Sequence, residues 1–144
     1  MLAETVRAVQ ARRAAAYSEW DEALRALLRD FEQREAYEAV CKSVTDAFSA
    51  ASRDVRAAAP ADDALIGELQ GLERRRFVAT TAVHEAKITH FVRPGVRPDS
   101  LEGLDLAADE TYRARLRDLA DEIAACDEGI YEIVTSLMPD VEDA

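Results

Sequence analysis

Apolar residues along the last third of the chain recur in alternating steps of four and three, and this spacing constrains the fold most. The series consists of Tyr112, Leu116, Leu119, Ile123, Cys126, Ile130, Ile133 and Leu137. Such spacing puts the apolar side chains on one stripe of an α-helix, and so long a stripe is typical of a helix that packs along another helix. We therefore expect a long helix over about residues 106–138, ending before Pro139, with a helical neighbour.

Similar stripes predict three helices earlier in the chain. These helices cover about residues 3–31, 36–59 and 63–91. The stripe of the first runs from Val6 through Arg13 to Phe31, and the stripe of the third includes Val83 and His90. Pro60 ends the second of them, because proline lacks the backbone N–H that a helix interior needs. Asp62 or Asp63 is a suitable N-cap for the third, since an aspartate side chain accepts hydrogen bonds from the first backbone N–H groups of a helix.

The boundary between the first two helices is open to two interpretations. Six residues separate Phe31 from Tyr37, and this distance fits no step of a helical stripe. We therefore expect a tight break at about residues 32–35. Because neither Gly nor Pro marks that position, a single bent helix is the alternative.

Two segments are predicted to lie outside the helices. Residues 92–104 contain a repeated Val-Arg-Pro motif and form the one extended loop, and residues 139–144 form an acidic tail. A linker is the favoured interpretation of the loop, although loops of this length are often functional. Arg93 and Arg97 are the only loop side chains that suggest a binding role.

Four helices with one apolar stripe each predict an all-α fold over residues 1–144. The expected architecture is an antiparallel bundle of about four long amphipathic helices, or a pair of long helical hairpins, with coiled-coil-like packing. Phe48 and Ile123 are expected in the core. Tyr17 and Trp20 are expected as aromatic anchors, because aromatic side chains dominate burial in a small bundle.

The charge of the chain favours protein partners over nucleic acid. Its 144 residues include 18 Lys and Arg against 29 Asp and Glu, a formal net charge of −11. Affinity for a DNA or RNA backbone comes mainly from cationic contacts to phosphate, so direct nucleic-acid binding is disfavoured. No run approaches the roughly 20 apolar residues of a membrane-spanning helix, and we expect no membrane association.

The sequence predicts no catalytic site, no cofactor and no metal. His84 and Glu85 begin a segment similar to the zinc-protease signature, but Ile88 stands where that signature needs its second histidine. His90 is six residues after His84 and points away from it on a helix. Neither histidine follows a glutamate by three residues, as a helical di-iron site requires. We expect a protein that is not an enzyme.

The densest basic cluster is the run Arg74-Arg75-Arg76. Three consecutive helical residues point in different directions, and Glu68 and Glu73 are close enough for ion pairs. A salt-bridged surface is therefore the favoured interpretation, and contact with a partner is the alternative. The candidate partner contacts are Arg74, Arg75, Arg93 and Arg97.

Positions in the first half of the chain carry a family resemblance. They are Val9, Gln10, Arg13, Tyr17, Trp20, Leu24, Leu28, Tyr37, Cys41, Val44, Thr45, Phe48, Ser52, Val55, Leu69, Leu72, Glu73, Phe77 and Thr80. The segment from Tyr37 to Val55, with its Cys-x-x-Val-Thr-x-x-Phe core, contributes most. This set resembles the required-for-excision 1-B domain family, small helical eukaryotic proteins named for a DNA-repair phenotype. The likeness covers about residues 9–81.

The resemblance implies a non-enzymatic accessory or scaffold role in DNA excision repair, exercised through protein partners in the nucleus or the cytoplasm. It supplies no catalytic residue. The alternative function is a structural helical subunit of a larger cytoplasmic or ciliary assembly. Long helices with faces large enough to contact a partner protein fit both functions. A half-apolar face left free would also let the chain associate with a second copy of itself.

Overall fold

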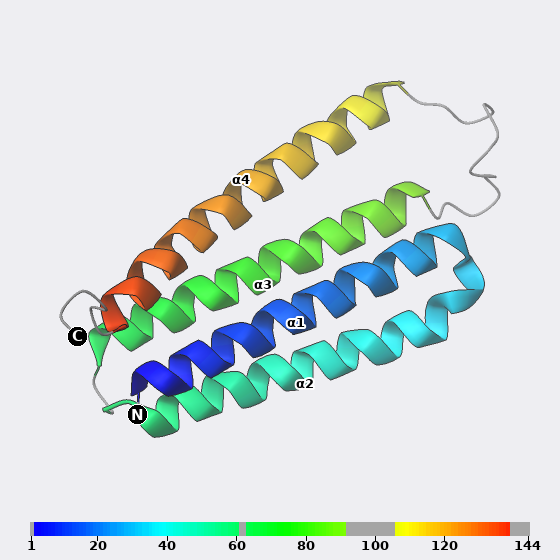
Figure 1. Ribbon diagram of the computed structural model, residues 1–144. Coiled ribbons are helices and arrows are strands. Elements are labelled where there is room, and N and C mark those ends of the chain that lie inside the picture. Colours follow the sequence, from blue (N-terminus) through cyan, green and yellow to red (C-terminus); the bar gives the residue numbers. More distant parts are fainter. Residues whose placement is uncertain (1, 61–62, 92–105, 139–144) are drawn as a thin grey trace.

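The computed structural model describes residues 2–60, 63–91 and 106–138, and in these ranges the chain is helical without β-strands (Figure 1). The elements are α1 (Leu2–Arg29), η1 (Phe31–Gln33), α2 (Arg34–Ala58), α3 (Ala64–Phe91) and α4 (Leu106–Leu137). The predicted all-α class is confirmed. The predicted loop at 92–104 and the predicted tail at 139–144 lie outside the described residues.

A short turn capped by an aspartate separates α1 from α2. Asp30 has extended backbone angles, φ −147° and ψ 105°, and its carboxylate accepts a hydrogen bond of 3.0 Å from the Glu32 N–H. This side-chain cap replaces the Gly or Pro that commonly marks a turn. The two helices are therefore separate, and a single bent helix is wrong. Phe31, the last residue of the first predicted stripe, is 50% exposed because α1 ends before it.

The N-cap predicted for the third helix is Asp63. Its Oδ1 accepts hydrogen bonds from the backbone N–H groups of Leu65 (3.0 Å) and Ile66 (3.1 Å). These bonds satisfy two of the four donors that the start of a helix leaves unpaired. Asp62, the other candidate, lies outside the described residues.

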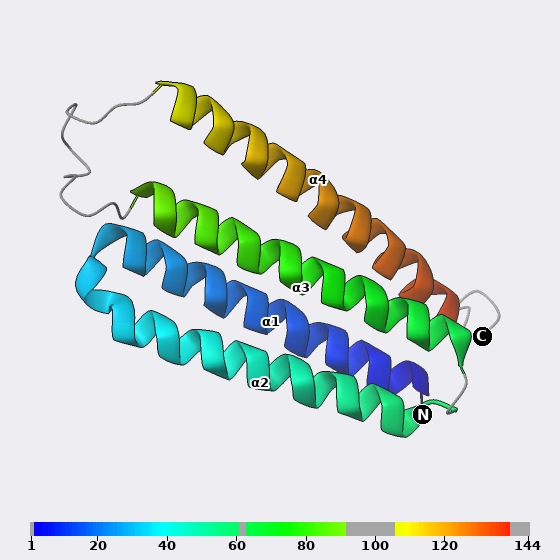
Figure 2. The same ribbon diagram turned by 180° about the vertical axis from the view of Figure 1, so that it is seen from behind.

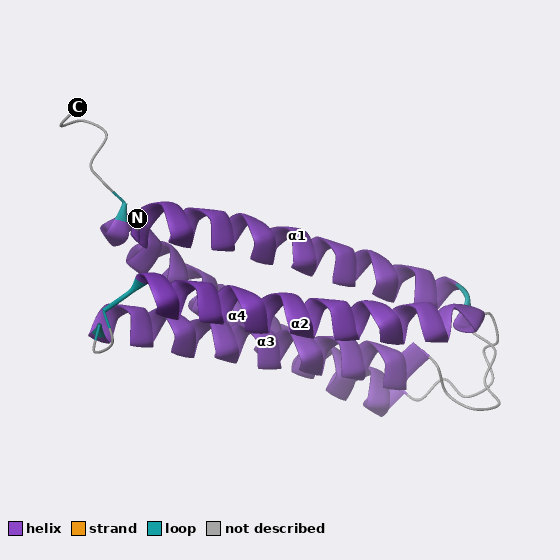
Figure 3. Ribbon diagram, turned by 90° about the horizontal axis from the view of Figure 1, so that it is seen from below, coloured by secondary structure: helices purple, strands orange, loops and turns teal. Residues whose placement is uncertain are grey.

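The helices form two antiparallel hairpins that pack against each other. Helix α1 packs mainly on α2, and α3 packs mainly on α4. The view from behind in Figure 2 shows the partners of each hairpin side by side, and Figure 3 shows the end of α4 next to the start of α1. We call this end of the bundle the proximal half and the opposite end the distal half. No helix in the described ranges is long and apolar enough to cross a bilayer.

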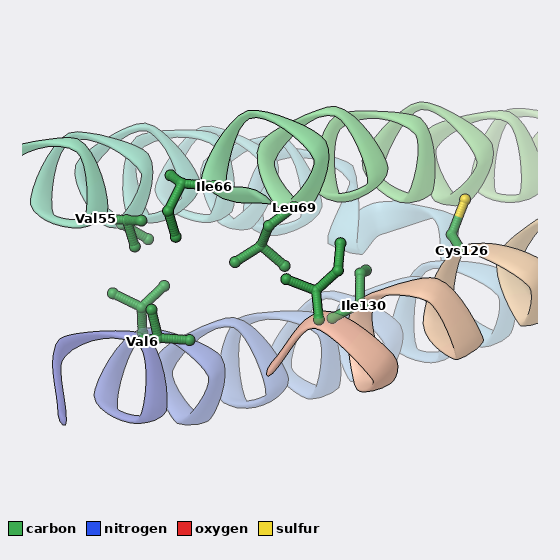
Figure 4. Close-up of a cluster of buried hydrophobic side chains, with 9 residues drawn as sticks. Val6, Val55, Ile66, Leu69, Cys126 and Ile130 are labelled. Atoms are coloured by element: carbon green, nitrogen blue, oxygen red, sulfur yellow. The ribbon is translucent and has the colours of Figure 1, made fainter. Parts of the chain in front are cut away.

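All four helices contribute to the core of the proximal half (Figure 4). Its buried residues are Val6, Val9, Ala51, Val55, Ile66, Leu69, Cys126, Ile130 and Ile133. These aliphatic side chains interdigitate between the two hairpins, so that they bury each other on every side. The proximal half is therefore a four-helix bundle with an apolar interior.

The core of the distal half is aromatic and comes from three helices. The ring centroids of Phe48 and Phe77 lie 5.2 Å apart, and those of Trp20 and Phe77 lie 5.3 Å apart. Tyr17 packs on Phe48 with a centroid separation of 4.7 Å. These residues belong to α1, α2 and α3, and no residue from the described part of α4 joins them. Large rings thus fill the space that a fourth helix fills in the proximal half.

Helix α4 follows the bundle core along only part of its length. Its buried residues Cys126, Ile130 and Ile133 belong to its second half. Before Cys126, the stripe residues Leu116 and Ile123 are only partly buried, and in Figure 1 α3 lies between the first part of α4 (yellow) and the other hairpin. Ile123 therefore corrects the prediction that the whole stripe of this helix is buried, because this part of α4 lies against α3.

Helix α3 is central and presents two faces to its neighbours. Glu73 and His84 contact α1 and α2, whereas Val83 and His90 lie beside α4. The predicted stripe included Val83 and His90 and missed the buried Glu73 and His84. A helix between two neighbours needs two packing faces. Its apolar residues therefore do not fall on one stripe, and the helical pattern in the sequence is weaker.

Candidate functional site

A cleft of about 340 Å³ lies between α2 and α3 and is the strongest candidate site. Its lining residues are Arg13, Thr45, Phe48, Ser49, Ser52, Arg53, Arg56, Gln70, Glu73, Arg74 and Phe77. Arg13 comes from α1 and forms part of its floor, because only 6% of that residue is exposed. We call this feature the arginine cleft.

The charge of the arginine cleft is opposite to that of the whole protein. Four arginines and one glutamate line it, a formal charge of +3, in a chain whose formal net charge is −11. A concave basic site with partly apolar walls concentrates its electrostatic potential and attracts anions locally. The cleft is therefore suited to an anionic group.

The Arg13 guanidinium is held at the floor by three contacts. Its Nη2 donates a hydrogen bond to Ser52 Oγ (3.3 Å), and its Nε lies 3.7 Å from Glu73 Oε1. The guanidinium carbon also lies 5.4 Å from the centre of the Phe48 ring. At 3.7 Å the Nε–Glu73 contact is an ion pair and not a hydrogen bond. Among the described residues, Arg13 Nε has no hydrogen-bond partner.

Glu73 is buried beside Arg13 and is fixed from its other side. Gln10 Nε2 donates a hydrogen bond of 2.8 Å to Glu73 Oε1, and the Glu73 residue is 5% exposed. Taking two charges out of water is costly, and the attraction between them offsets that cost only with good geometry and further hydrogen bonds. A buried ion pair at the floor of a cleft is thus a feature that stability alone does not explain.

The rim of the arginine cleft consists of three exposed arginines, Arg53, Arg56 and Arg74. Arg56 Nε donates to Gln70 Oε1 (3.0 Å), and Gln70 Nε2 donates to the Ser52 carbonyl (3.1 Å), which joins α2 to α3. Within the described ranges, neither Arg53 nor Arg74 has an ion-pair partner. Two rim cations are therefore available to a ligand.

The structure separates the sequence-predicted candidates. Arg74 lies on the rim of the cleft, whereas Arg75 points to α4 and forms an ion pair with Glu122 (2.8 Å). The Glu122 carboxylate raises the pKa of Arg75, and both side chains are well exposed. Arg93 and Arg97 lie outside the described residues.

The third arginine of the run, Arg76, links the two hairpins. Its guanidinium carbon lies 3.8 Å from the centre of the Tyr17 ring, and its Nε donates to Asp127 Oδ1 (2.5 Å). The three consecutive arginines thus have three different environments, as their helical spacing requires. Sequence reasoning missed Arg13, Arg53 and Arg56. The signal for Arg13 was its position as a cation within an apolar stripe.

A second polar cluster surrounds His84, which is 2% exposed. Its Nε2 lies 3.3 Å from Asp21 Oδ1 and its Nδ1 lies 3.0 Å from the Tyr37 hydroxyl. Because a carboxylate only accepts hydrogen bonds, Nε2 carries the proton and Nδ1 accepts from Tyr37 in the neutral ring. Burial lowers the pKa of His84, and the Asp21 hydrogen bond partly opposes this. These contacts join α1, α2 and α3 in the distal half.

The two histidines lie in different surroundings. His90 is at the distal end of α3, where its Nε2 lies 3.2 Å from Asp109 Oδ1 and its ring stacks on Tyr112 with a centroid distance of 3.9 Å. Among the residues that the structure describes, no group of three or more His, Cys, Asp or Glu side chains is arranged to hold a metal ion.

The comparisons with known proteins identify a family for most of this fold. The sequence model of the DNA repair REX1-B family matches residues 1–87. No curated protein and no solved structure matched the chain. The matched region contains α1, α2 and most of α3, and therefore every residue that lines the arginine cleft. The match spans more than half of the 144 residues, so the chain belongs to the DNA repair REX1-B family.

Proposed function

We propose that this protein is a non-enzymatic adaptor in DNA excision repair, and that its arginine cleft binds an acidic segment of a protein partner in the nucleus. The family membership supports the connection to repair. The observation that carries the binding role is the arginine cleft, a site of formal charge +3 that lies wholly within the family-matched region.

The shape of the cleft favours a short segment of a protein. Its volume of about 340 Å³ is near the lower end of ligand pockets, enough for a few side chains. The rim arginines offer planar guanidinium groups that pair with carboxylates through two hydrogen bonds at once. A short acidic stretch of a partner protein would therefore match the arginine cleft in both charge and size.

The charge around the cleft disfavours a nucleic-acid strand. A protein that binds a DNA backbone neutralises several phosphates with cations spread along its surface. Here, after Arg117 the chain has no further Lys or Arg, and α4 carries Asp118, Asp121, Glu122, Asp127, Glu128 and Glu132. An extended polyanion would meet these carboxylates, whereas a short acidic segment can stay within the cleft.

Affinity capture from the source cell, before and after DNA damage, tests this proposal. The test variant carries Arg53→Glu, Arg56→Glu and Arg74→Glu. The matched control carries Arg113→Glu, Arg115→Glu and Arg117→Glu, which makes the same charge change at exposed positions of α4. We expect excision-repair proteins to remain bound to the parent and control after nuclease treatment, and to be lost from the cleft variant.

Two results would overturn the proposal. Recovery of cytoskeletal or ciliary subunits in place of repair proteins would favour a structural subunit of another assembly. Equal recovery of repair proteins by the cleft variant and the α4 control would separate the repair role from the arginine cleft. Circular dichroism of both variants establishes that the helices are intact before either result is interpreted.

A further inference from the structure

The floor of the arginine cleft indicates a more specific ligand than its overall charge does. Arg13 is buried, yet its Nε has no hydrogen-bond partner among the described residues. A buried donor without a partner costs free energy, and native proteins rarely leave one unpaired. Because Arg13 also lines the cleft, an anionic group that enters the cleft would lie against this guanidinium.

From this geometry we infer that the arginine cleft is a phosphate-monoester site that binds a phosphoserine or phosphothreonine of the partner protein. The inference deepens the proposed adaptor function and rests on it. The phosphate would meet Arg13 at the floor and the three rim arginines at the mouth. Binding of the partner would then depend on its phosphorylation.

The donors that line the cleft suit a group with several acceptor oxygens. Besides the Arg13 guanidinium, the cleft offers the guanidinium groups of Arg53 and Arg74, which have no ion-pair partner in the described ranges. Ser52 Oγ accepts its hydrogen bond from Arg13, so its own O–H is available to donate. A phosphate monoester presents three terminal oxygens, and charge-assisted hydrogen bonds from arginine are among the strongest that proteins form.

The charge balance favours phosphate over a carboxylate at the floor. Glu73 already neutralises one of the four arginines, which leaves a formal charge of +3. A carboxylate would bring one negative charge, whereas a phosphate monoester brings about 1.5 to 2 at neutral pH. The larger charge compensates more of the cleft and offsets more of the cost of leaving water.

The arrangement of the arginines favours a phosphorylated side chain over a nucleic acid. The cations converge on a single cavity and do not follow a strip, as contacts to successive phosphodiesters would require. A phosphoserine or phosphothreonine extends from its backbone, so it can reach a buried floor while the peptide stays at the rim. The acidic α4 again disfavours an extended polyanion.

The first experiment follows the Arg13 Nε–H signal by nuclear magnetic resonance of the full chain. Inorganic phosphate is added at constant ionic strength, and acetate is the control anion. We expect the Arg13 signal to shift in a saturable way with phosphate and much less with acetate. The Arg75 Nε–H signal is the internal reference, because Arg75 donates to Glu122 away from the cleft. Unchanged or equally shifted Arg13 and Arg75 signals would contradict the inference.

The second experiment measures binding of short peptides by fluorescence anisotropy. A peptide pool with a fixed phosphoserine is compared with its unphosphorylated form and with a 5′-phosphorylated single-stranded oligonucleotide. We expect the phosphopeptides to bind at least about tenfold more tightly than the other two. Equal affinity of the two peptide pools, or preference for the oligonucleotide, would overturn the inference.

Matched variants locate the phosphate contact. Arg53→Gln with Arg74→Gln is expected to weaken phosphopeptide binding at least about tenfold, and Arg113→Gln with Arg117→Gln to leave it unchanged. Arg13→Lys keeps the charge but removes the Nε–H, so it should abolish the preference for phosphate while a thermal melt still shows a folded protein. No effect of the rim variant would contradict the inference.

Phosphatase treatment of the cell extract distinguishes failure of this inference from failure of the proposed function. If capture of repair proteins depends on the cleft but survives phosphatase, the adaptor function stands and the phosphate inference is wrong. Loss of capture after phosphatase, with recovery when phosphatase inhibitors are present, is the result we expect.

Discussion

The two halves of the bundle have cores of different composition. In the proximal half four helices bury aliphatic side chains such as Val6 and Ile130. In the distal half three helices pack aromatic rings such as Trp20 and Phe48. Arg13 and Glu73 lie between the two cores, near the middle of α1 and in the first half of α3, whereas His84 lies in the distal half beside Trp20. The aliphatic core is thus regular, and the buried polar groups lie outside it.

This difference teaches that the candidate site lies where the two kinds of core meet. A uniform aliphatic core stabilises the fold but offers no polar or charged group to a ligand. The arginine cleft extends from Arg56 and Gln70, beside the aliphatic core, to Phe48 and Phe77 of the aromatic core. Each prediction below tests whether this division between the halves is real.

The largest expected effect comes from truncation in the aromatic core. Phe48→Ala removes a ring that contacts both Tyr17 and Phe77, and should destabilise the protein by about 3–5 kcal/mol. Urea unfolding followed by circular dichroism measures the change. The neighbouring Ser49→Ala is exposed and should stay within about 0.5 kcal/mol of the parent. If Phe48→Ala unfolds like the parent, the account of the distal core is wrong.

Removal of one partner of the buried ion pair should have the next largest effect. Glu73→Leu leaves Arg13 buried without its carboxylate, and should cost about 2–3 kcal/mol. This is below the usual range because Arg13 keeps its hydrogen bond to Ser52 and borders the cleft. The double variant Arg13→Met with Glu73→Leu should recover most of the stability in the same urea assay. A double variant as unstable as Glu73→Leu alone would show that the pair itself is needed for folding.

Helix α4 provides a comparison between the halves within one element. Ile123→Ala, at a partly buried position before the four-helix core, should cost about 1–2 kcal/mol. Ile130 is 7% exposed in the four-helix core, and Ile130→Ala should cost more, about 2–4 kcal/mol. Thermal and urea unfolding of the two variants measure the difference. Equal losses would mean that α4 is buried along its whole length, as the sequence stripe predicts.

The smallest effect is a pH dependence that originates at His84. Because burial lowers the pKa of His84 in the folded state below its ordinary value of 6.5, the unfolded chain binds this proton more readily. The stability is therefore fully present above about pH 6.5 and is lost as the pH falls through the lowered folded-state pKa. Asp21, Tyr37 and Lys87 face or influence the ring. His84→Gln should flatten this loss between about pH 7 and 5 in urea unfolding. An unchanged slope would locate the pH dependence elsewhere.

Much of the fold could be predicted from local pattern, because each helix carries its own signal. The break between the first two helices was detectable from the misfit between Phe31 and Tyr37, and Asp63 from its capping position. The two faces of α3 were not detectable in the same way. That helix has two neighbours, so its apolar residues do not form a single stripe.

The candidate site could be predicted only in part, because packing assembles it from three helices. Arg74 was a candidate as a member of a basic run, but Arg13 and Arg53 are far from it in sequence. They meet Arg74 only after the two hairpins pack. The sequence feature that could have indicated Arg13 is the position of an arginine within an apolar stripe. Arg75 had the same local pattern as Arg74 but forms an ion pair with α4.

The central claim is that the arginine cleft, and not the acidic surface of α4, contacts the repair partner. A photo-crosslinking amino acid placed at Ser49, on the cleft, is compared with one placed at Tyr131, which is 71% exposed on α4. After DNA damage, we predict crosslinks to a repair protein from position 49 and none from position 131. Crosslinks from position 131 alone, or from position 49 to DNA, would contradict the account.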